Sequence, residues 1–248
     1  MNQISTKNIH LLPDPSALKE ICKSLAALEA IICPEWEYRY YSYQKDWSAT
    51  EEFCEMRNGQ GDHMLIVFSE HETCINGFDH ESELNGWKEI EVKETKSLFS
   101  KLFGSKKEIK TPLTQEIALG ILDNLPPAFN EFIYGEPVKS IGTTFCVWQT
   151  KTDDSWNMGK AIHLDDDYED GSSNLFHLLD RNPMTFKNWA EEYYEEEFEH
   201  RKLDIALIEK IYSGSTITKE LVLKINPNYQ DFPKLKSELD EIGYSNEL

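Results

Sequence analysis

The segment "RNGQGDHMLIVF", Arg57 to Phe68, decides how the first half of the chain folds. Its last five residues are all apolar, and a short apolar run of this kind is typical of a strand that is buried on both faces. Gly59 and Gly61 favour a turn immediately before this strand. After a turn at "SEHE", the segment "TCINGF" has the composition of a hairpin partner.

The residues before this hairpin predict one helix and one further strand. Asp14 is a capping residue and Pro15 suits the first helical position, so a helix should begin there and end before Pro34. The aromatic alternation of "WEYRYYSY", residues 36–43, predicts a strand. Residues 47–58 fit a short helix and a loop equally well.

Beyond the hairpin, a helix is expected from Thr111 and Pro112 onward, broken by the prolines at 126 and 127. Strands are expected at 143–150 and 155–162. The sheet should therefore have about five strands, mostly linked as hairpins and hence antiparallel.

After residue 165 the pattern becomes helical, with expected helices at 172–180, 182–199, 203–213, 218–226 and 231–242. The fold class is therefore α+β. We expect an α+β sheet domain at 1–165, with an N-terminal helix, and an acidic helical subdomain at 166–248 packed on it.

The charge of the chain limits its partners. It contains 45 acidic residues against 25 Lys and Arg, a net charge of −20. Such a charge repels nucleic acid and anionic membranes and favours a basic protein partner or metal ions. The five scattered cysteines include no CxxC pair, and neither a signal peptide nor a membrane span is apparent. A cytoplasmic protein is expected.

Half of this negative charge lies in residues 161–200, which contain 12 acidic and 2 basic residues. Such a run of acidic residues usually forms a solvent-exposed helix face. The functional alternative is a surface that binds a basic protein. The residues expected on that surface are Asp165, Asp166, Asp167, Glu169, Asp170, Glu192, Glu195, Glu196 and Glu199.

No cofactor is expected from the sequence. The alternative is a divalent cation, because the loop "HLDDDYEDGSS", residues 163–173, is rich in oxygen ligands. An EF-hand register fails, because Tyr168 and His177 occupy ligand positions. The candidate metal ligands are His163, Asp165, Asp166, Asp167 and Asp170.

A second candidate site lies at the ends of the predicted hairpin. If the two strands pair, their ends bring together an arginine, three carboxylates and a histidine that suit acid–base or metal-ligand chemistry. These candidate catalytic residues are Arg57, Asp62, Asp79, His80 and Glu81. The sequence contains neither a nucleophile elbow nor a P-loop, and "NGQG" precedes a strand, unlike a dinucleotide-binding loop.

The segment at 88–110 is locally basic, with seven Lys and four Glu. Its arm at 93–110 could contact an acidic surface, including the protein's own helices.

Several stretches resemble a family of uncharacterised bacterial proteins, namely "LPDPSALKEICKSLAALEAIICPEWEYRYYSY", "MRNGQGDHMLIVFS", "GFDHES" and "NPMTFKNWAEEYYE". The resemblance covers most of the chain apart from 94–110 and implies no particular activity. In acidity and size the chain also resembles immunity proteins of polymorphic toxin systems.

Together these features favour a non-catalytic, soluble protein whose acidic face binds a basic protein, such as an immunity-type inhibitor of a bacterial toxin. The alternative is an enzyme, metal-dependent in one version, with its site near the Arg57–Asp62 loop and Asp79–Glu81.

Overall fold

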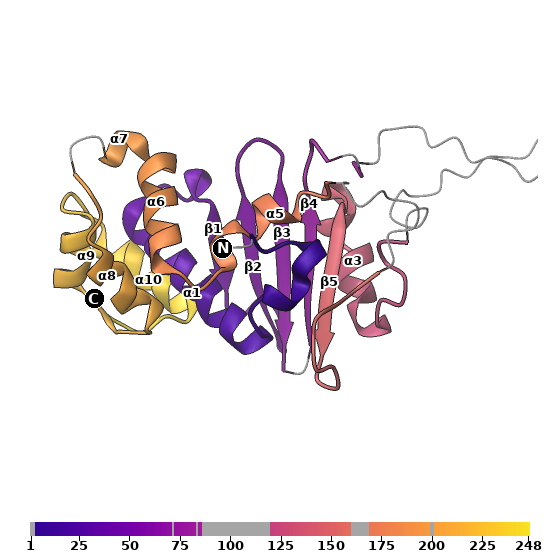
Figure 1. Ribbon diagram of the computed structural model, residues 1–248. Coiled ribbons are helices and arrows are strands. Elements are labelled where there is room, and N and C mark those ends of the chain that lie inside the picture. Colours follow the sequence, from indigo (N-terminus) through magenta and orange to yellow (C-terminus); the bar gives the residue numbers. More distant parts are fainter. Residues whose placement is uncertain (1–2, 71, 83, 86–119, 160–168, 199–200) are drawn as a thin grey trace, which may run out of the picture.

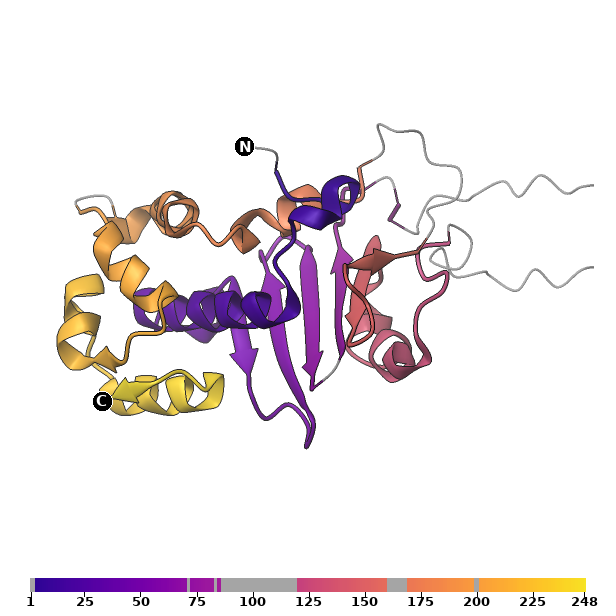
Figure 2. The ribbon, with the colours of Figure 1, turned by 60° about the horizontal axis from the view of Figure 1, so that its bottom comes forward.

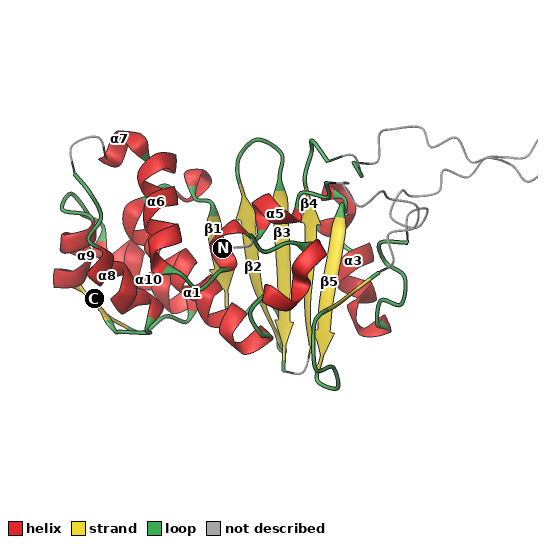
Figure 3. Cartoon of the chain, in the orientation of Figure 1, coloured by secondary structure: helices red, strands yellow, loops and turns green. Residues whose placement is uncertain are grey.

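The computed structural model describes residues 3–70, 72–82, 84–85, 120–159, 169–198 and 201–248. Its centre is an antiparallel sheet whose strand order follows the chain, and helices gather at the β1 end of this sheet (Figures 1 and 3). The strands are β1 (Tyr41–Gln44), β2 (Glu51–Arg57), β3 (His63–Ser69), β4 (Glu72–Phe78), β5 (Phe145–Thr150) and β6 (Asn157–Met158). The predicted α+β class and the antiparallel sheet are confirmed, with six strands in place of about five.

Strand β3 lies inside the sheet and is buried on both faces, as its apolar run predicts. Met64 and Ile66 face the larger core, which also contains the apolar side of the N-terminal helix. Leu65 and Val67 face a smaller core on the other side. Gly59 and Gly61, in the turn before this strand, both have positive φ angles, which L side chains rarely adopt.

The N-terminal helix α1 (Pro15–Ile32) follows a short 3-10 helix, η1 (Thr6–Leu11). The Asp14 side chain accepts a hydrogen bond from the Ala17 backbone nitrogen, and Pro15 occupies the first turn, as predicted. Helix α1 contacts β1 on one side and the C-terminal helices on the other (Figure 2). It is therefore the element around which the larger core is organised.

The segment "WEYRYYSY" is a strand only in its last part, so that prediction was wrong for its first residues. Trp36–Tyr38 form a 3-10 helix, η2, and β1 starts at Tyr41. The cause is Arg39, which is buried and donates hydrogen bonds to the backbone oxygens of Cys33 (2.7 Å) and Pro34 (3.0 Å). These bonds hold the chain against the end of α1 before it can enter the sheet.

The ambiguous stretch at 47–58 contains β2, which was expected to be a helix or a loop. Three of its seven residues are glutamates, which interrupt the alternation of apolar and polar residues that indicates a strand. Glu52 is compensated by tertiary contacts, because Lys19 (2.7 Å) and Lys23 (2.9 Å) on α1 both form ion pairs with it. Partners that lie far away in sequence thus allow an acidic strand inside the sheet.

Between β4 and β5 the predicted helix from Thr111 lies mostly outside the described residues, and 120–124 form a turn. Three short helices follow and cover the smaller core: η4 (Pro127–Phe129), α3 (Asn130–Tyr134) and α4 (Val138–Ile141). The Lys-rich arm at 93–110 also lies outside the described part of the chain.

The C-terminal region is helical, as predicted: α5 (Ser172–Leu175), η5 (His177–Leu179), α6 (Pro183–Tyr193), α7 (Glu195–Phe198), α8 (Ile205–Tyr212), α9 (Lys219–Ile225) and α10 (Phe232–Ile242). A small parallel pair, β7 (Ile217–Thr218) and β8 (Asn246–Glu247), was not predicted. The expected single helix after Asn182 is broken at Tyr194, whose hydroxyl donates a hydrogen bond to the Glu29 carboxylate.

The proposed domain boundary at residue 165 lies outside the described residues. The larger core extends across it, because residues of α1, the sheet and α5–α10 form one contiguous apolar cluster. Within the described ranges, none of the helices combines the length and the apolar character that crossing a membrane requires.

Candidate functional site

The β3–β4 hairpin brings Asp62 and Asp79 to the same edge of the sheet. His63 is paired with Phe78 in this hairpin, so Asp62, one residue before the pair, and Asp79, one residue after it, lie opposite each other. Asn58 closes the preceding turn. Its side-chain nitrogen donates to Asp62 Oδ2 (2.6 Å), and its Oδ1 accepts from the Asp62 backbone nitrogen (3.1 Å).

His80 completes this cluster. Its backbone nitrogen donates to Asp62 Oδ1 (2.9 Å), and its Nδ1 lies 2.7 Å from the same oxygen. One ligand atom from each of Asp62, Asp79 and His80 lies within 4.8 Å of the other two. The hydrogen bond to Asp62 raises the pKa of the His80 imidazole above its ordinary value. The predicted convergence at the hairpin end therefore holds for these three residues.

Asp79 is the buried member of the cluster, with 7% of its surface exposed. Its Oδ1 accepts hydrogen bonds from the backbone nitrogens of Glu81 (2.9 Å) and Ser82 (3.0 Å). Burial raises the pKa of this carboxyl, and the nearby charge of Asp62 raises it further. A buried carboxylate beside a second one is electrostatically costly unless a cation balances them.

Of the other two predicted catalytic residues, Glu81 borders this cluster, and Arg57 lies apart from it. The Glu81 side chain is 85% exposed, and its Oε1 is 3.8 Å from His80 Nε2. Arg57 is paired with His63 across β2 and β3, so it shares the face of His63, and Asp62 lies on the opposite face. The Arg57 guanidinium instead lies 3.7 Å from the centroid of the Trp36 ring and donates to the Trp36 backbone oxygen (2.8 Å).

Of the acidic loop, only the end is described, so His163, Asp165, Asp166 and Asp167 lie outside the described residues. Glu169 is exposed and forms an ion pair with Lys7 (3.3 Å). Asp170 is 5% exposed, and its carboxylate accepts hydrogen bonds from Thr6 Oγ1 and from the backbone nitrogen and hydroxyl of Ser172. Because its oxygens are used inside the protein, Asp170 supports the start of α5 and does not lie on the exposed acidic face.

The end of the acidic loop lies beside the hairpin cluster. Ser82 Oγ donates to the Glu169 backbone oxygen (2.8 Å), and Thr144 Oγ1 donates to the Asp170 backbone oxygen (2.7 Å). A side chain at Gly171 would collide with Asp79, since a Cβ there would lie 2.2 Å from the Asp79 Cβ. The two regions that the sequence suggested separately therefore meet at one edge of the sheet.

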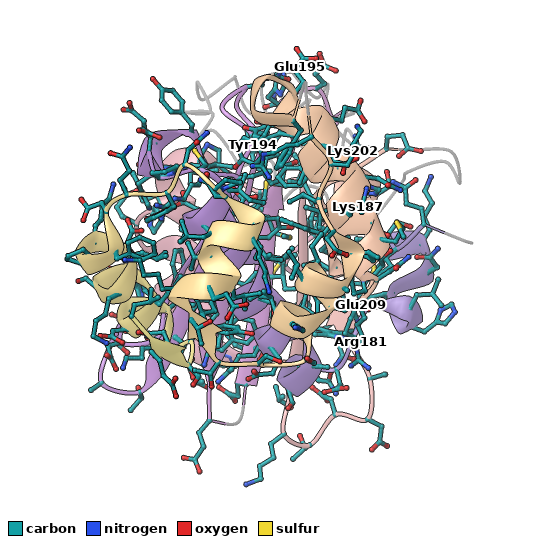
Figure 4. All side chains as sticks on the ribbon, turned by 90° about the vertical axis from the view of Figure 1, so that its left-hand side faces the viewer. Arg181, Lys187, Tyr194, Glu195, Lys202 and Glu209 are labelled. Carbon is teal, nitrogen blue, oxygen red and sulfur yellow. The ribbon has the colours of Figure 1, made fainter. Side chains whose placement is uncertain are left out.

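The expected acidic face of α6 and α7 carries charges of both signs. Glu192 and Glu195 are exposed, whereas Glu199 and the side chain of Glu196 lie outside the described part of the chain. Glu191 is nearly buried between Lys187 (2.7 Å) and Lys202 (3.2 Å). Figure 4 shows Glu195 at the upper end of this face, with Lys187 and Lys202 below it.

An aromatic hollow at the end of α6 was not predicted. Its volume is about 360 Å³, and its lining residues are Glu37, Tyr38, Arg39, Arg57, Asn58, Gly59, Tyr193 and Tyr194. Tyr38 is 63% exposed, and Tyr193 is also exposed. The aromatic content of "WEYRYYSY" and of the α6 segment was visible, but sequence alone could not show that these segments meet.

A second hollow of about 270 Å³ lies on the other side of the Trp36–Arg57 stack. Trp36 and Trp47 line it, and both are exposed large aromatic side chains. Arg39 lines both hollows, and Glu238 on α10 forms an ion pair with it (2.9 Å). The two hollows thus share the buried Arg39 in their linings, and exposed aromatic side chains line both of them.

Glu29 lies in the core beneath this surface. Its Oε2 accepts hydrogen bonds from the Tyr40 backbone nitrogen (2.8 Å) and from the Tyr194 hydroxyl, whereas its Oε1 has no partner among the described groups. Burial raises the pKa of this carboxyl to about 7. Glu29 thus connects α1, the chain before β1 and the end of α6 through one ionisable group.

Comparison with known proteins gave no match: the chain fits no family model, and neither curated proteins nor solved structures are detectably similar to it.

Proposed function

We propose that this chain is a non-catalytic binding protein that holds a basic protein partner on the surface around the two aromatic hollows. The observation that carries this proposal is the exposure of aromatic side chains at both hollows: Tyr38 and Tyr193 line one hollow with Arg57, and Trp36 and Trp47 line the other. Tryptophan, tyrosine and arginine are the residues that contribute most of the binding energy at protein interfaces.

The charges around this surface favour a basic partner. Glu35 and Glu37 are exposed next to Trp36 and Tyr38, and Glu192 and Glu195 are exposed on either side of the two hollow-lining tyrosines of α6. Arg39 is already paired with Glu238. The aromatic centre therefore has an acidic rim, in a chain whose net charge of −20 attracts cationic proteins over a distance.

An immunity-type inhibitor of a basic bacterial toxin is one protein of this class, and it is the form that the acidity and size of the chain favour. We propose that this chain acts in the cytoplasm, because all five of its cysteines are free thiols, as is usual in a reducing compartment.

This proposal can be tested by affinity capture from the source organism with quantitative mass spectrometry. The wild type should retain a basic protein at low salt and lose it as ionic strength rises, because salt screens the rim charges. Tyr38→Ala with Tyr193→Ala should reduce that capture at least about tenfold, as expected when hot-spot aromatics are removed.

Tyr134→Ala is the matched control. Tyr134, at the end of α3, is also an exposed tyrosine, but it lines neither hollow. Its removal should leave capture unchanged. Equal capture by the double variant and the control, or no captured partner at any ionic strength, contradicts the proposal.

A further inference from the structure

We propose that Asp62, Asp79 and His80 form a binding site for a divalent transition-metal ion of the Zn²⁺ or Mn²⁺ kind. This site does not depend on the proposed function, although Asn58, which donates a hydrogen bond to Asp62, also lines the hollow of about 360 Å³. An imidazole nitrogen and two carboxylate oxygens, all within 4.8 Å of one another, are ligands that such ions accept.

Hydrogen bonds from the protein hold both carboxylates of the cluster. Asp62 Oδ2 accepts from the Asn58 side chain, and Asp62 Oδ1 accepts from the His80 backbone nitrogen and faces His80 Nδ1. Asp79 Oδ1 accepts from the backbone nitrogens of Glu81 and Ser82, and Asp79 Oδ2 lies against Gly171. Hydrogen bonds that orient ligand carboxylates in this way are typical of metal sites.

Within the described ranges, no Lys or Arg nitrogen forms an ion pair with Asp62 or Asp79, although only 7% of Asp79 is exposed. His80 is the basic group that faces Asp62 there, and its Nε2 also lies 3.8 Å from Glu81 Oε1. A divalent cation would compensate the charges of Asp62 and Asp79 and offset the cost of burying Asp79.

Binding requires only a small change in geometry. His80 Nδ1 and Asp62 Oδ1 are 2.7 Å apart, a distance that suits a shared proton. An ion that replaces this proton would separate the two atoms to about 3.4 Å, given tetrahedral coordination with metal–ligand distances of about 2.1 Å. The His80 side chain can move by this amount because it is partly exposed. Asp79 fits beside Gly171, where a residue with a side chain would collide with it.

The test is isothermal titration of untagged, chelator-treated protein with Zn²⁺ and, separately, with Mn²⁺ and Mg²⁺. The wild type should bind about one Zn²⁺ at micromolar or lower concentration, and Mg²⁺ should not compete, because magnesium prefers oxygen ligands only. Asp79→Asn and His80→Ala should each weaken Zn²⁺ binding at least about tenfold. Zn²⁺ should also raise the melting temperature of the wild type but not of Asp79→Asn.

His177→Ala is the control, because His177 is an exposed histidine on η5. Asp79→Asn retains the oxygen that caps Glu81 and Ser82, so its fold should persist, and circular dichroism will verify it. If Asp79→Asn binds Zn²⁺ as tightly as His177→Ala, the cluster is a hydrogen-bonded hairpin end and not a metal site. Wild-type affinity weaker than millimolar for both Zn²⁺ and Mn²⁺ overturns the proposal equally.

Discussion

At the scale of single residues, Glu29 is an ionisable carboxyl that folding removes from solvent. Its carboxyl lies inside the larger core, accepts two hydrogen bonds on one oxygen and none from described groups on the other. Its pKa is raised from 4.5 to about 7 by burial, although the hydrogen bonds from Tyr194 and Tyr40 act in the opposite direction. The folded state therefore holds this proton to a higher pH than the unfolded state does.

The stability of the protein should consequently fall as pH rises from about 4.5 to about 7 and change no further through this group above that range. Replacing Glu29 with glutamine removes the charge and keeps an oxygen for the Tyr40 nitrogen. We expect Glu29→Gln to be more stable than the wild type at pH 8, by up to roughly 3 kcal/mol, and similar to it at pH 4.5. Urea denaturation at both pH values measures this difference.

Glu209→Gln serves as the control, because Glu209 is an exposed glutamate on α8 (Figure 4). It should follow the wild-type dependence of stability on pH. Parallel curves for Glu29→Gln and the wild type would show that Glu29 does not titrate in this range.

At the scale of elements, Gly171 connects the start of α5 to the β4 end. It has a φ of +84°, and a Cβ there would lie 2.2 Å from the Asp79 Cβ. Gly59, in the turn between β2 and β3, has a similar φ of +73°, but a Cβ there would have nothing within 4 Å of it. The two glycines therefore share the same backbone requirement and differ in the space around them.

Gly59→Ala should cost about 1–2 kcal/mol, which is the cost of a left-handed conformation for an L residue. Gly171→Ala should cost about 1–3 kcal/mol more, because the added methyl group displaces Asp79. It should also weaken Zn²⁺ binding, whereas Gly59→Ala should not. Chemical denaturation and titration of both variants measure these effects, and equal losses of stability would contradict the predicted contact.

At the scale of the whole molecule, the helical region and the sheet share one core. Helix α1 contacts β1 as well as α8, α9 and α10, so its apolar surface is covered from both sides. Residues from Ile4 to Tyr244 belong to the same cluster. The region predicted as a domain and the region predicted as a subdomain packed on it thus contribute to a common core.

A chain that ends at residue 165 should therefore fail to fold on its own. It would expose the side of α1 that contacts α8 and α10, and the loss of several buried aliphatic side chains costs more than the usual total stability of a domain. We expect a broad, non-cooperative thermal transition for this fragment and a single cooperative one for the full chain. A sharp transition in the fragment would instead establish an independent domain at 1–165.

Features that depend on neighbouring residues could be predicted from the sequence. Asp14 with Pro15 starts α1, Thr218 caps α9, and Gly243 ends α10 in a left-handed conformation. The burial of Met64–Phe68 followed from five apolar residues in succession. Capping and periodicity are local, so the residues that produce them are close together in the chain.

The candidate site was predictable only in part. The meeting of Asp62 with Asp79 and His80 follows from a short hairpin, whose register is set by a nearby turn. The orientation of Arg57 toward Trp36 and the burial of Asp170 under Thr6 depend on partners elsewhere in the chain.

The sequence by itself thus determined the start of α1, the buried strand β3 and the hairpin that carries three of the five predicted residues. The tertiary structure alone decided that Tyr38 and Tyr193 line one hollow, that Glu29 lies beneath it, and that β2 tolerates its glutamates. The physical reason is distance along the chain. Packing brings together side chains that are 33 residues apart, as for Lys19 and Glu52, or 165 apart, as for Glu29 and Tyr194. Neither periodicity nor capping indicates which of them will meet.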